Sequence, residues 1–171
     1  MMVTFLNLGL GTPVIRAADT ITGDLGALGA RFIMDGAPSD GRFSLVEHPI
    51  TPRGLAAPVH LHTNEDEFSF VLEGRWGFQL GSTVVYGEPG DLVYKPRDVW
   101  HTFWNATDEP ARLLEIISPA GFEHMFVEGL ELARTVPDDA EAGLALLHRY
   151  GLQIDLEATA PIVAEHGLID R

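Results

Sequence analysis

The middle of the chain alternates short apolar runs with turn-forming residues. Between residues 30 and 118, runs rich in Val, Phe, Tyr, Trp and Thr are separated by Gly, Pro or Asp. Runs of this kind, about eight to twelve residues apart, are typical of an antiparallel β-sandwich or barrel. The predicted strands are 30–34, 42–50, 67–72, 76–80, 83–86, 91–94, 101–105 and 112–117.

The two ends of the chain have a different texture. Residues 1–29 mix apolar residues with Gly, Thr and Pro without a sustained period, so we interpret them as an N-terminal arm. Residues 119–171 read as a helical extension that packs on the barrel, because their apolar residues follow helical spacing. The predicted helices begin near Phe122, cover 137–150 up to a stop at Gly151, and lie near 160–166.

Composition limits the function classes. The 171 residues are 46% hydrophobic and 21% charged, which indicates one folded domain. Lys and Arg number 11 against 25 Asp and Glu, a net charge of -14 that repels phosphate and anionic lipid. We therefore expect neither nucleic acid nor a membrane as a partner. The first residues lack the basic region of a signal peptide, so a cytoplasmic location is expected.

Two segments carry the candidate chemistry, and both combine His or Glu with regularly placed Gly, Pro and Asn. They contain Gly54, His60, His62, Glu67 and Gly74, and then Gly90, Pro96, His101 and Asn105. Side chains two apart on a strand share a face, so His60 and His62 can aim at one point. Glu67 and His101 begin neighbouring predicted strands and can complete the set. Three imidazoles and a carboxylate suit a divalent first-row metal.

These two segments resemble the paired motifs of the cupin superfamily. The resemblance implies an all-β, double-stranded β-helix (a jelly roll, or cupin barrel), here with the C-terminal α-helical extension. It implies His60, His62, Glu67 and His101 as ligands of one divalent metal per chain, which is Fe, Mn, Co, Ni or Zn. The family pattern has a glycine where this chain has Asp98. Aspartate tolerates a left-handed turn, so we expect the turn to survive.

A narrower resemblance concerns the string EFSFVLEGRWGFQLG, the later SPAGFE and the helical tail. These are similar to small bacterial quercetin 2,3-dioxygenase-like cupins. In that group the metal binds the flavonol hydroxyl, the ligand glutamate takes up its proton, and O₂ adds with release of carbon monoxide. The resemblance implies that Glu67 is both a metal ligand and the catalytic base. Thiol dioxygenases of the superfamily generally lack the glutamate, and this chain has no cysteine for their crosslink.

Three functional classes stay open. The first is a dioxygenase that cleaves a flavonol-like or other enolisable aromatic substrate with O₂. The second is a metal-dependent isomerase, epimerase or decarboxylase of a small acid or sugar, whose anionic substrate calls for inward Arg or Lys. Lys95 is the only lysine, and no cationic clamp is evident. The third is a non-catalytic cupin that binds a small molecule.

Aromatic residues are candidates for a substrate pocket. Trp76, Phe78 and Phe103 either line such a pocket or belong to the core, and Phe103 shares strand parity with His101. Phe122 and the start of the predicted helix, with Met125 and Phe126, either close the barrel mouth or pack on the outer face. The histidines without ligand spacing are given ordinary structural roles; they are His48, His124, His148 and His166. Uncovered edge strands favour a homodimer.

Overall fold

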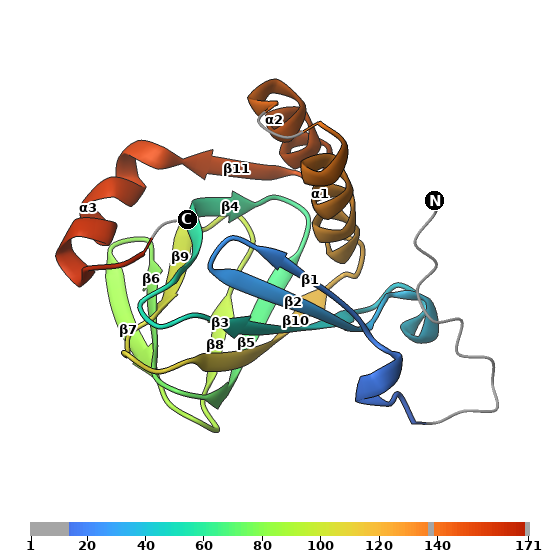
Figure 1. The fold of residues 1–171 in the computed structure, drawn as a ribbon, viewed down its shortest axis with the longest axis horizontal. Helices are drawn as coiled ribbons and strands as arrows, with labels where there is room; N and C mark the ends of the chain where they lie inside the picture. Colours follow the sequence, from blue (N-terminus) through green and yellow to red (C-terminus); the bar gives the residue numbers. More distant parts are fainter. Residues whose placement is uncertain (1–13, 137–138, 170–171) are drawn as a thin grey trace.

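The computed structural model describes residues 14–136 and 139–169, and its strands form two antiparallel sheets (Figure 1). In the six-stranded sheet the order is β1 (Ile21–Leu25), β2 (Leu28–Met34), β3 (Ser44–Ile50), β10 (Ala111–Ser118), β5 (Asp66–Glu73) and β8 (Leu92–Lys95). In the five-stranded sheet it is β11 (Leu152–Asp155), β4 (Leu55–His62), β9 (His101–Asn105), β6 (Trp76–Leu80) and β7 (Thr83–Gly87). Strands distant in sequence are neighbours, as in a jelly roll. The predicted all-β jelly roll with a helical extension is confirmed.

Alternating burial along the strands defines the inner faces of the two sheets. In β10, Leu113, Glu115 and Ile117 are buried, whereas the residues between them are partly exposed. In β5 the inward set is Glu67, Ser69 and Val71. Both strands thus place polar side chains among apolar ones on the inner face. The interior of the barrel therefore contains the polar residues Glu67, Ser69 and Glu115 as well as a hydrophobic core.

Three α-helices make up most of the C-terminal extension: α1 (Glu123–Thr135), α2 (Ala140–Arg149) and α3 (Leu156–His166). Two short 3₁₀ turns, η1 (Ala17–Asp19) and η2 (Ala37–Ser39), lie near the N-terminal strands. The predicted stop after α2 is confirmed, since Gly151 has a left-handed φ of 71°. The predicted start of this helix at residues 137–138 lies outside the described residues. None of the helices described combines the length and hydrophobicity of a transmembrane segment.

Three strands were not predicted. Residues 21–25 form β1, which pairs with β2, so the sheet begins before residue 30 and part of the expected arm belongs to it; residues 1–13 lie outside the described range. A strand at the edge of a sheet needs no continuous apolar run, so the sequence of β1 does not read as a strand. The strand β4 is rich in Ala, Pro and His and lacks the composition used to predict strands. The C-terminal extension contains the strand β11 as well as helices, and the four residues of β11 are too few to show a period.

Gly77 in β6 illustrates how tightly the outer layer is packed. A Cβ atom at this position would overlap the indole ring of the buried Trp104. We expect Gly77→Ala to lower the free energy of unfolding by about 1–3 kcal/mol, the usual range for overpacking. Urea unfolding followed by circular dichroism measures this change.

The matched control is Gly143→Ala in α2, where no atom lies within 4 Å of the added Cβ. This substitution should raise the free energy of unfolding by up to about 1 kcal/mol, because alanine favours a helix over glycine. Equal effects of the two substitutions would contradict the packing argument.

Candidate metal centre

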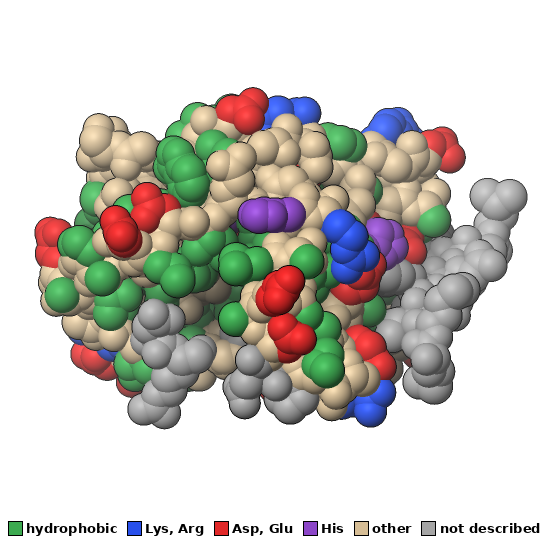
Figure 2. Space-filling model, turned by 90° about the horizontal axis from the view of Figure 1, so that it is seen from above, with side chains coloured by type: hydrophobic (Ala, Val, Ile, Leu, Met, Phe, Trp, Pro, Cys, Tyr) green, Lys and Arg blue, Asp and Glu red, His purple; other side chains and the backbone are tan. Residues whose placement is uncertain are grey.

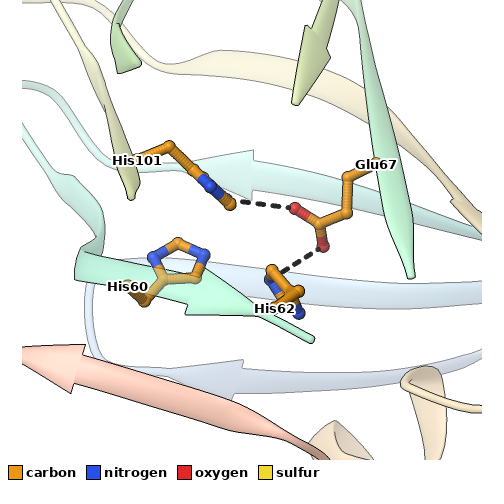
Figure 3. Close-up of side chains that lie close together, drawn as sticks. All are labelled: His60, His62, Glu67 and His101. Atoms are coloured by element: carbon orange, nitrogen blue, oxygen red, sulfur yellow. Dashed lines mark ion pairs between the residues drawn. The ribbon is translucent and has the colours of Figure 1, made fainter. Parts of the chain in front are cut away.

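The structure brings the four residues of the predicted ligand set together between the two sheets. His60 and His62 come from β4, His101 from β9 and Glu67 from β5. One potential ligand atom from each residue lies within 4.8 Å of the others, and all four residues are buried. Figure 3 shows the three rings and the carboxylate directed toward a common region, with ion pairs from Glu67 to His62 and His101.

Each imidazole is held by a hydrogen bond from its Nδ1 atom. In His60 and His101 the acceptor is the backbone carbonyl two residues earlier in the chain, at 2.7 and 2.9 Å. In His62 it is the carboxylate of the buried Glu65, at 2.5 Å. Because carbonyl and carboxylate oxygens only accept, Nδ1 carries the proton and the lone pair is on Nε2. This is the arrangement that orients metal-binding histidines.

Two of these Nε2 atoms make no hydrogen bond among the described residues. Within the part of the chain that the structure describes, His62 Nε2 and His101 Nε2 are buried and make no hydrogen bond. Each lies 3.5 Å from an oxygen of Glu67. Buried polar atoms without partners are rare and costly, and a cation would satisfy both lone pairs. The residues therefore fit a divalent metal, with a donor set that does not distinguish Fe, Mn, Co, Ni or Zn.

A buried charge network adjoins the cluster, and the sequence analysis did not foresee it. The ammonium Nζ of Lys95 lies 2.7 Å from Glu67 Oε2 and 2.9 Å from Glu115 Oε2. It also lies 4.0 Å from the centroid of the Phe103 ring, and the Ser69 hydroxyl donates to Glu115. A signal for Glu115 existed, because it stands two residues from both Leu113 and Ile117 in an alternating strand.

The pKa values in this network separate the roles of its carboxylates. Burial alone would raise the pKa of Glu67, but the charges of Lys95 and His62 lower it well below its usual range. Burial, together with the charge of Glu67, raises the pKa of Glu115 to about 7, against the opposing effect of Lys95. Burial lowers the pKa values of His60 and His101. An ionised Glu67 and neutral His60 and His101 are the protonation states that a metal requires.

A cavity of about 270 Å³ opens onto the cluster. Besides the cluster residues its lining is mostly apolar, and the extension supplies much of it; these residues are Phe122, Met125, Phe126, Leu147, Leu152 and Ile154. Phe122, Met125 and Phe126 thus line the cavity, and their closure of the barrel mouth stays a prediction. The ring of Phe122 meets that of His62 edge-on, with centroids 4.4 Å apart.

The three aromatic pocket candidates separate into two groups. Phe103 lines the cavity. Trp76 and Phe78 are not among its lining residues; they are fully buried and stack behind Phe103, with ring centroids 6.0 and 6.1 Å away. Phe103 could be recognised from the sequence because it lies two residues from His101 on the same strand. Trp76 and Phe78 lie on β6, and their distance from the cavity depends on how β6 and β9 pack, which the sequence does not show.

The turn before β9 also holds the site. Asp98 has a left-handed φ of 62°, as expected for the residue that replaces the glycine of the family pattern. Its backbone N–H donates to the carbonyl of His62 at 2.8 Å. The side chain of Asn105 donates to the carbonyls of Thr51 and Glu109. These bonds fix the loops that flank the two histidine strands.

Comparison with known proteins agrees with this architecture. Residues 48–117 match the family model of the Cupin domain. KdgF from Halomonas sp. is 16% identical with a TM-score of 0.56, over 64% of this chain and 97% of that chain. A predicted oxalate decarboxylase from Thermotoga maritima is 15% identical with a TM-score of 0.57, over 62% and 98%. A sugar phosphate isomerase from a cupin superfamily, from Silicibacter pomeroyi, is 21% identical with a TM-score of 0.52, over 62% and 75%.

These findings support the cupin superfamily, and at such identities the structural likeness shows the fold alone. No curated protein matches the sequence. The narrower resemblance to quercetin 2,3-dioxygenase-like cupins stays a prediction.

Glu65 provides a test of the metal centre that leaves all four ligands in place. We expect Glu65→Gln to weaken metal binding by about 10–100-fold, because the neutral amide orients His62 less firmly and makes it a weaker donor. Competition of Zn²⁺ between the protein and a chromophoric chelator measures the affinity.

The control is Glu88→Gln. This substitution also removes one carboxylate charge, but Glu88 is exposed at the surface and is not part of the cluster. If Glu65→Gln and Glu88→Gln bind Zn²⁺ as tightly as the wild type, His62 does not depend on Glu65 for metal binding.

His48 predicts an acid-sensitive stability. This buried histidine donates from Nδ1 to the carbonyl of Gly29 at 2.8 Å, and burial lowers its pKa from 6.5 to about 4. Its neutral form thus favours the folded state. The contribution is complete above pH 6.5 and is lost as the pH falls toward 4, a change of roughly 3 kcal/mol. We expect His48→Leu to reduce the slope of unfolding free energy against pH in this window.

Urea unfolding of the metal-free protein at a series of pH values gives these slopes. The exposed His148→Gln variant should keep the wild-type slope. Equal slopes for wild type and His48→Leu would show that His48 is not held neutral by the fold.

Proposed function

We propose that the protein is a metal-dependent dioxygenase that acts, with O₂, on a small apolar substrate bearing an acidic hydroxyl, such as a flavonol or another phenol or enol. The observation that carries this proposal is the cavity itself. It is walled mainly by apolar side chains, it reaches the His-His-Glu-His cluster, and its lining contains no Arg or Lys. Such a cavity favours a neutral, largely apolar compound.

His60, His62, Glu67 and His101 would hold the metal. When bound there, a divalent metal supplies a Lewis acid for the substrate hydroxyl and, if it is Fe, Mn, Co or Ni, one-electron redox chemistry. The apolar walls exclude water from the reacting region. Phe103 and Phe122 border the cavity beside the cluster, so they are suited to hold an aromatic ring against it.

Glu67 is the proposed proton acceptor. Burial raises its pKa, but Lys95 and the neighbouring His62 and His101 together lower it well below the usual range, so the carboxylate is ionised and weakly basic. A weak base takes a proton efficiently only from an acidic group. An enol or phenol hydroxyl would meet that requirement once a bound metal increases its acidity, and it does so better than a C–H bond. This argument favours chemistry that begins at a substrate hydroxyl.

One observation favours the second class, a metal-dependent isomerase, epimerase or decarboxylase. Glu115 also borders the cavity, and burial raises its pKa to about 7, which suits a base that removes a proton from carbon. Two of the similar structures are described as a predicted oxalate decarboxylase and a sugar phosphate isomerase. An anionic substrate of that kind would find no Arg or Lys among the described lining residues and would depend on the metal alone for a positive charge. Figure 2 shows the molecule from above, relative to the view of Figure 1. On this face the described Lys and Arg side chains are scattered and form no positively charged patch that could attract an anion.

The test combines metal analysis with oxygen consumption. We expect protein purified without chelator to contain metal, and protein reconstituted with Fe, Mn, Co or Ni to consume O₂ in the presence of a flavonol and release carbon monoxide. Glu67→Gln should lower the rate of O₂ uptake by about 100-fold or more while some metal is retained. The double variant His60→Ala with His101→Ala should lose the metal, and Glu88→Gln should behave as wild type.

The outcomes separate the classes. Bound metal without O₂ uptake on flavonols or simple phenols would refute the dioxygenase and direct the search to isomerase-like chemistry or ligand binding. Full activity in Glu67→Gln would refute its role as the base. Absence of metal under all conditions would assign the four residues a structural role.

A further inference from the structure

His48 is the feature of the cavity that the proposed function leaves unused. It lies on β3, on the inner face of the six-stranded sheet, and is 1% exposed. Its ring borders the same cavity as the metal cluster, but it is not one of the four clustered residues. A buried polar side chain in a mostly apolar wall is informative, because apolar cavities use few polar groups to orient a ligand.

The hydrogen bonding of His48 leaves one position open. Nδ1 is paired with the carbonyl of Gly29 at 2.8 Å, so the proton is on Nδ1 and the lone pair is on Nε2. The ring is neutral at physiological pH, since burial lowers its pKa to about 4. Among the described residues, none makes a hydrogen bond with Nε2. The ring can therefore accept one further hydrogen bond and can donate none.

The surroundings of His48 offer no other acceptor that is equally open. The ring packs on Phe126 with centroids 5.4 Å apart, and Leu28 and Met125 continue the apolar wall. Glu115, the other polar lining residue outside the cluster, already accepts from Ser69 and Lys95. A ligand that brings an O–H or N–H group to this wall would find its acceptor in His48.

The position of His48 in the sheet separates its backbone from that of Glu67. Along the inner face, β3 is followed by β10 and then by β5, which carries Glu67. Two strand spacings correspond to about 10 Å. The pairing of His48 with Leu113, and of Glu67 with Ile117, adds a displacement along the strands. A ligand that reaches both places needs polar groups at its two ends.

We propose that His48 is a substrate-binding residue whose Nε2 accepts a hydrogen bond from a hydroxyl or N–H group at the end of the substrate remote from the metal ligands. The substrate class is then an apolar, ring-containing framework with two separated donor groups, such as a polyhydroxylated aromatic compound. The inference deepens the proposed function and rests on it in one respect, the use of this cavity as the substrate site.

The test compares 4-ethylphenol with its isomer 4-methylanisole, which has the same atoms but no O–H donor. Isothermal titration of chelator-treated protein gives the two affinities without a metal that could bind the phenol hydroxyl. We expect the wild type to bind 4-ethylphenol about fivefold more tightly, as one hydrogen bond predicts. His48→Leu should bind the two compounds equally. His48→Gln, which keeps an acceptor, should retain part of the preference, and the exposed His148→Gln variant should retain all of it.

A second measurement does not depend on the fold of His48→Leu. In wild-type protein labelled with ¹⁵N-histidine, the Nε2 resonance of His48 should show a lone-pair nitrogen that shifts with 4-ethylphenol but not with 4-methylanisole. The His48→Gln spectrum assigns this resonance. An unchanged Nε2 resonance, an undiminished phenol preference in His48→Leu, or binding of neither compound would overturn the proposal.

The two proposals fail separately. A phenol preference that depends on His48, in a protein that consumes no O₂, would support His48 and refute the dioxygenase. Metal-dependent O₂ uptake with a preference that does not depend on His48 would do the reverse.

Discussion

The burial of Lys95 between two carboxylates is the constraint on which the rest of the site depends. Removing an ammonium group from water is costly unless it is paired, and Lys95 Nζ lies within 2.9 Å of both Glu67 and Glu115. These three residues come from β8, β5 and β10, which are adjacent in the six-stranded sheet. Their ion pairs hold Glu67 toward the histidines of the other sheet. Burial, together with the charge of Glu67, raises the pKa of Glu115 to about 7 against the opposing effect of Lys95, so the ionised Glu67 is the carboxylate available to a cation.

The C-terminal extension belongs to the site as much as the barrel does. Its strand β11 pairs with β4, so that Leu152 lies opposite His62 and Ile154 opposite His60. Without β11, β4 would be the edge of its sheet, and the strand with two candidate ligands would lose one of its two neighbours. The same segment, together with Phe122, lines the cavity. One length of chain therefore pairs with the ligand strand and also contributes apolar wall to the cavity.

The sequence predicts the parts of this site that depend on spacing along one strand. His60 and His62 share a face because they are two residues apart, and Phe103 follows His101 by the same rule. Lys95 could not be placed in this way, because its contact with Glu67 depends on the register between β5 and β8, which no local pattern contains. The strands β1 and β11 were missed for a related reason: an edge strand is stabilised by its neighbour more than by its own composition. Glu115 had a readable signal, since it alternates with Leu113 and Ile117.

Similar barrels with different described activities show that this fold does not decide the reaction. In this chain the decision rests on how the same lysine affects two carboxylates. Burial raises the pKa of Glu67, but Lys95 and the neighbouring histidines lower it and leave a weak base beside the candidate ligands, whereas burial and the charge of Glu67 raise the pKa of Glu115 to about 7 against Lys95. A substrate whose reaction begins at an acidic hydroxyl needs only the first carboxylate. Because the walls are apolar and the open acceptor of His48 takes only a donor group, a neutral hydroxylated substrate fits each of these features, and an anionic one fits only the basicity of Glu115.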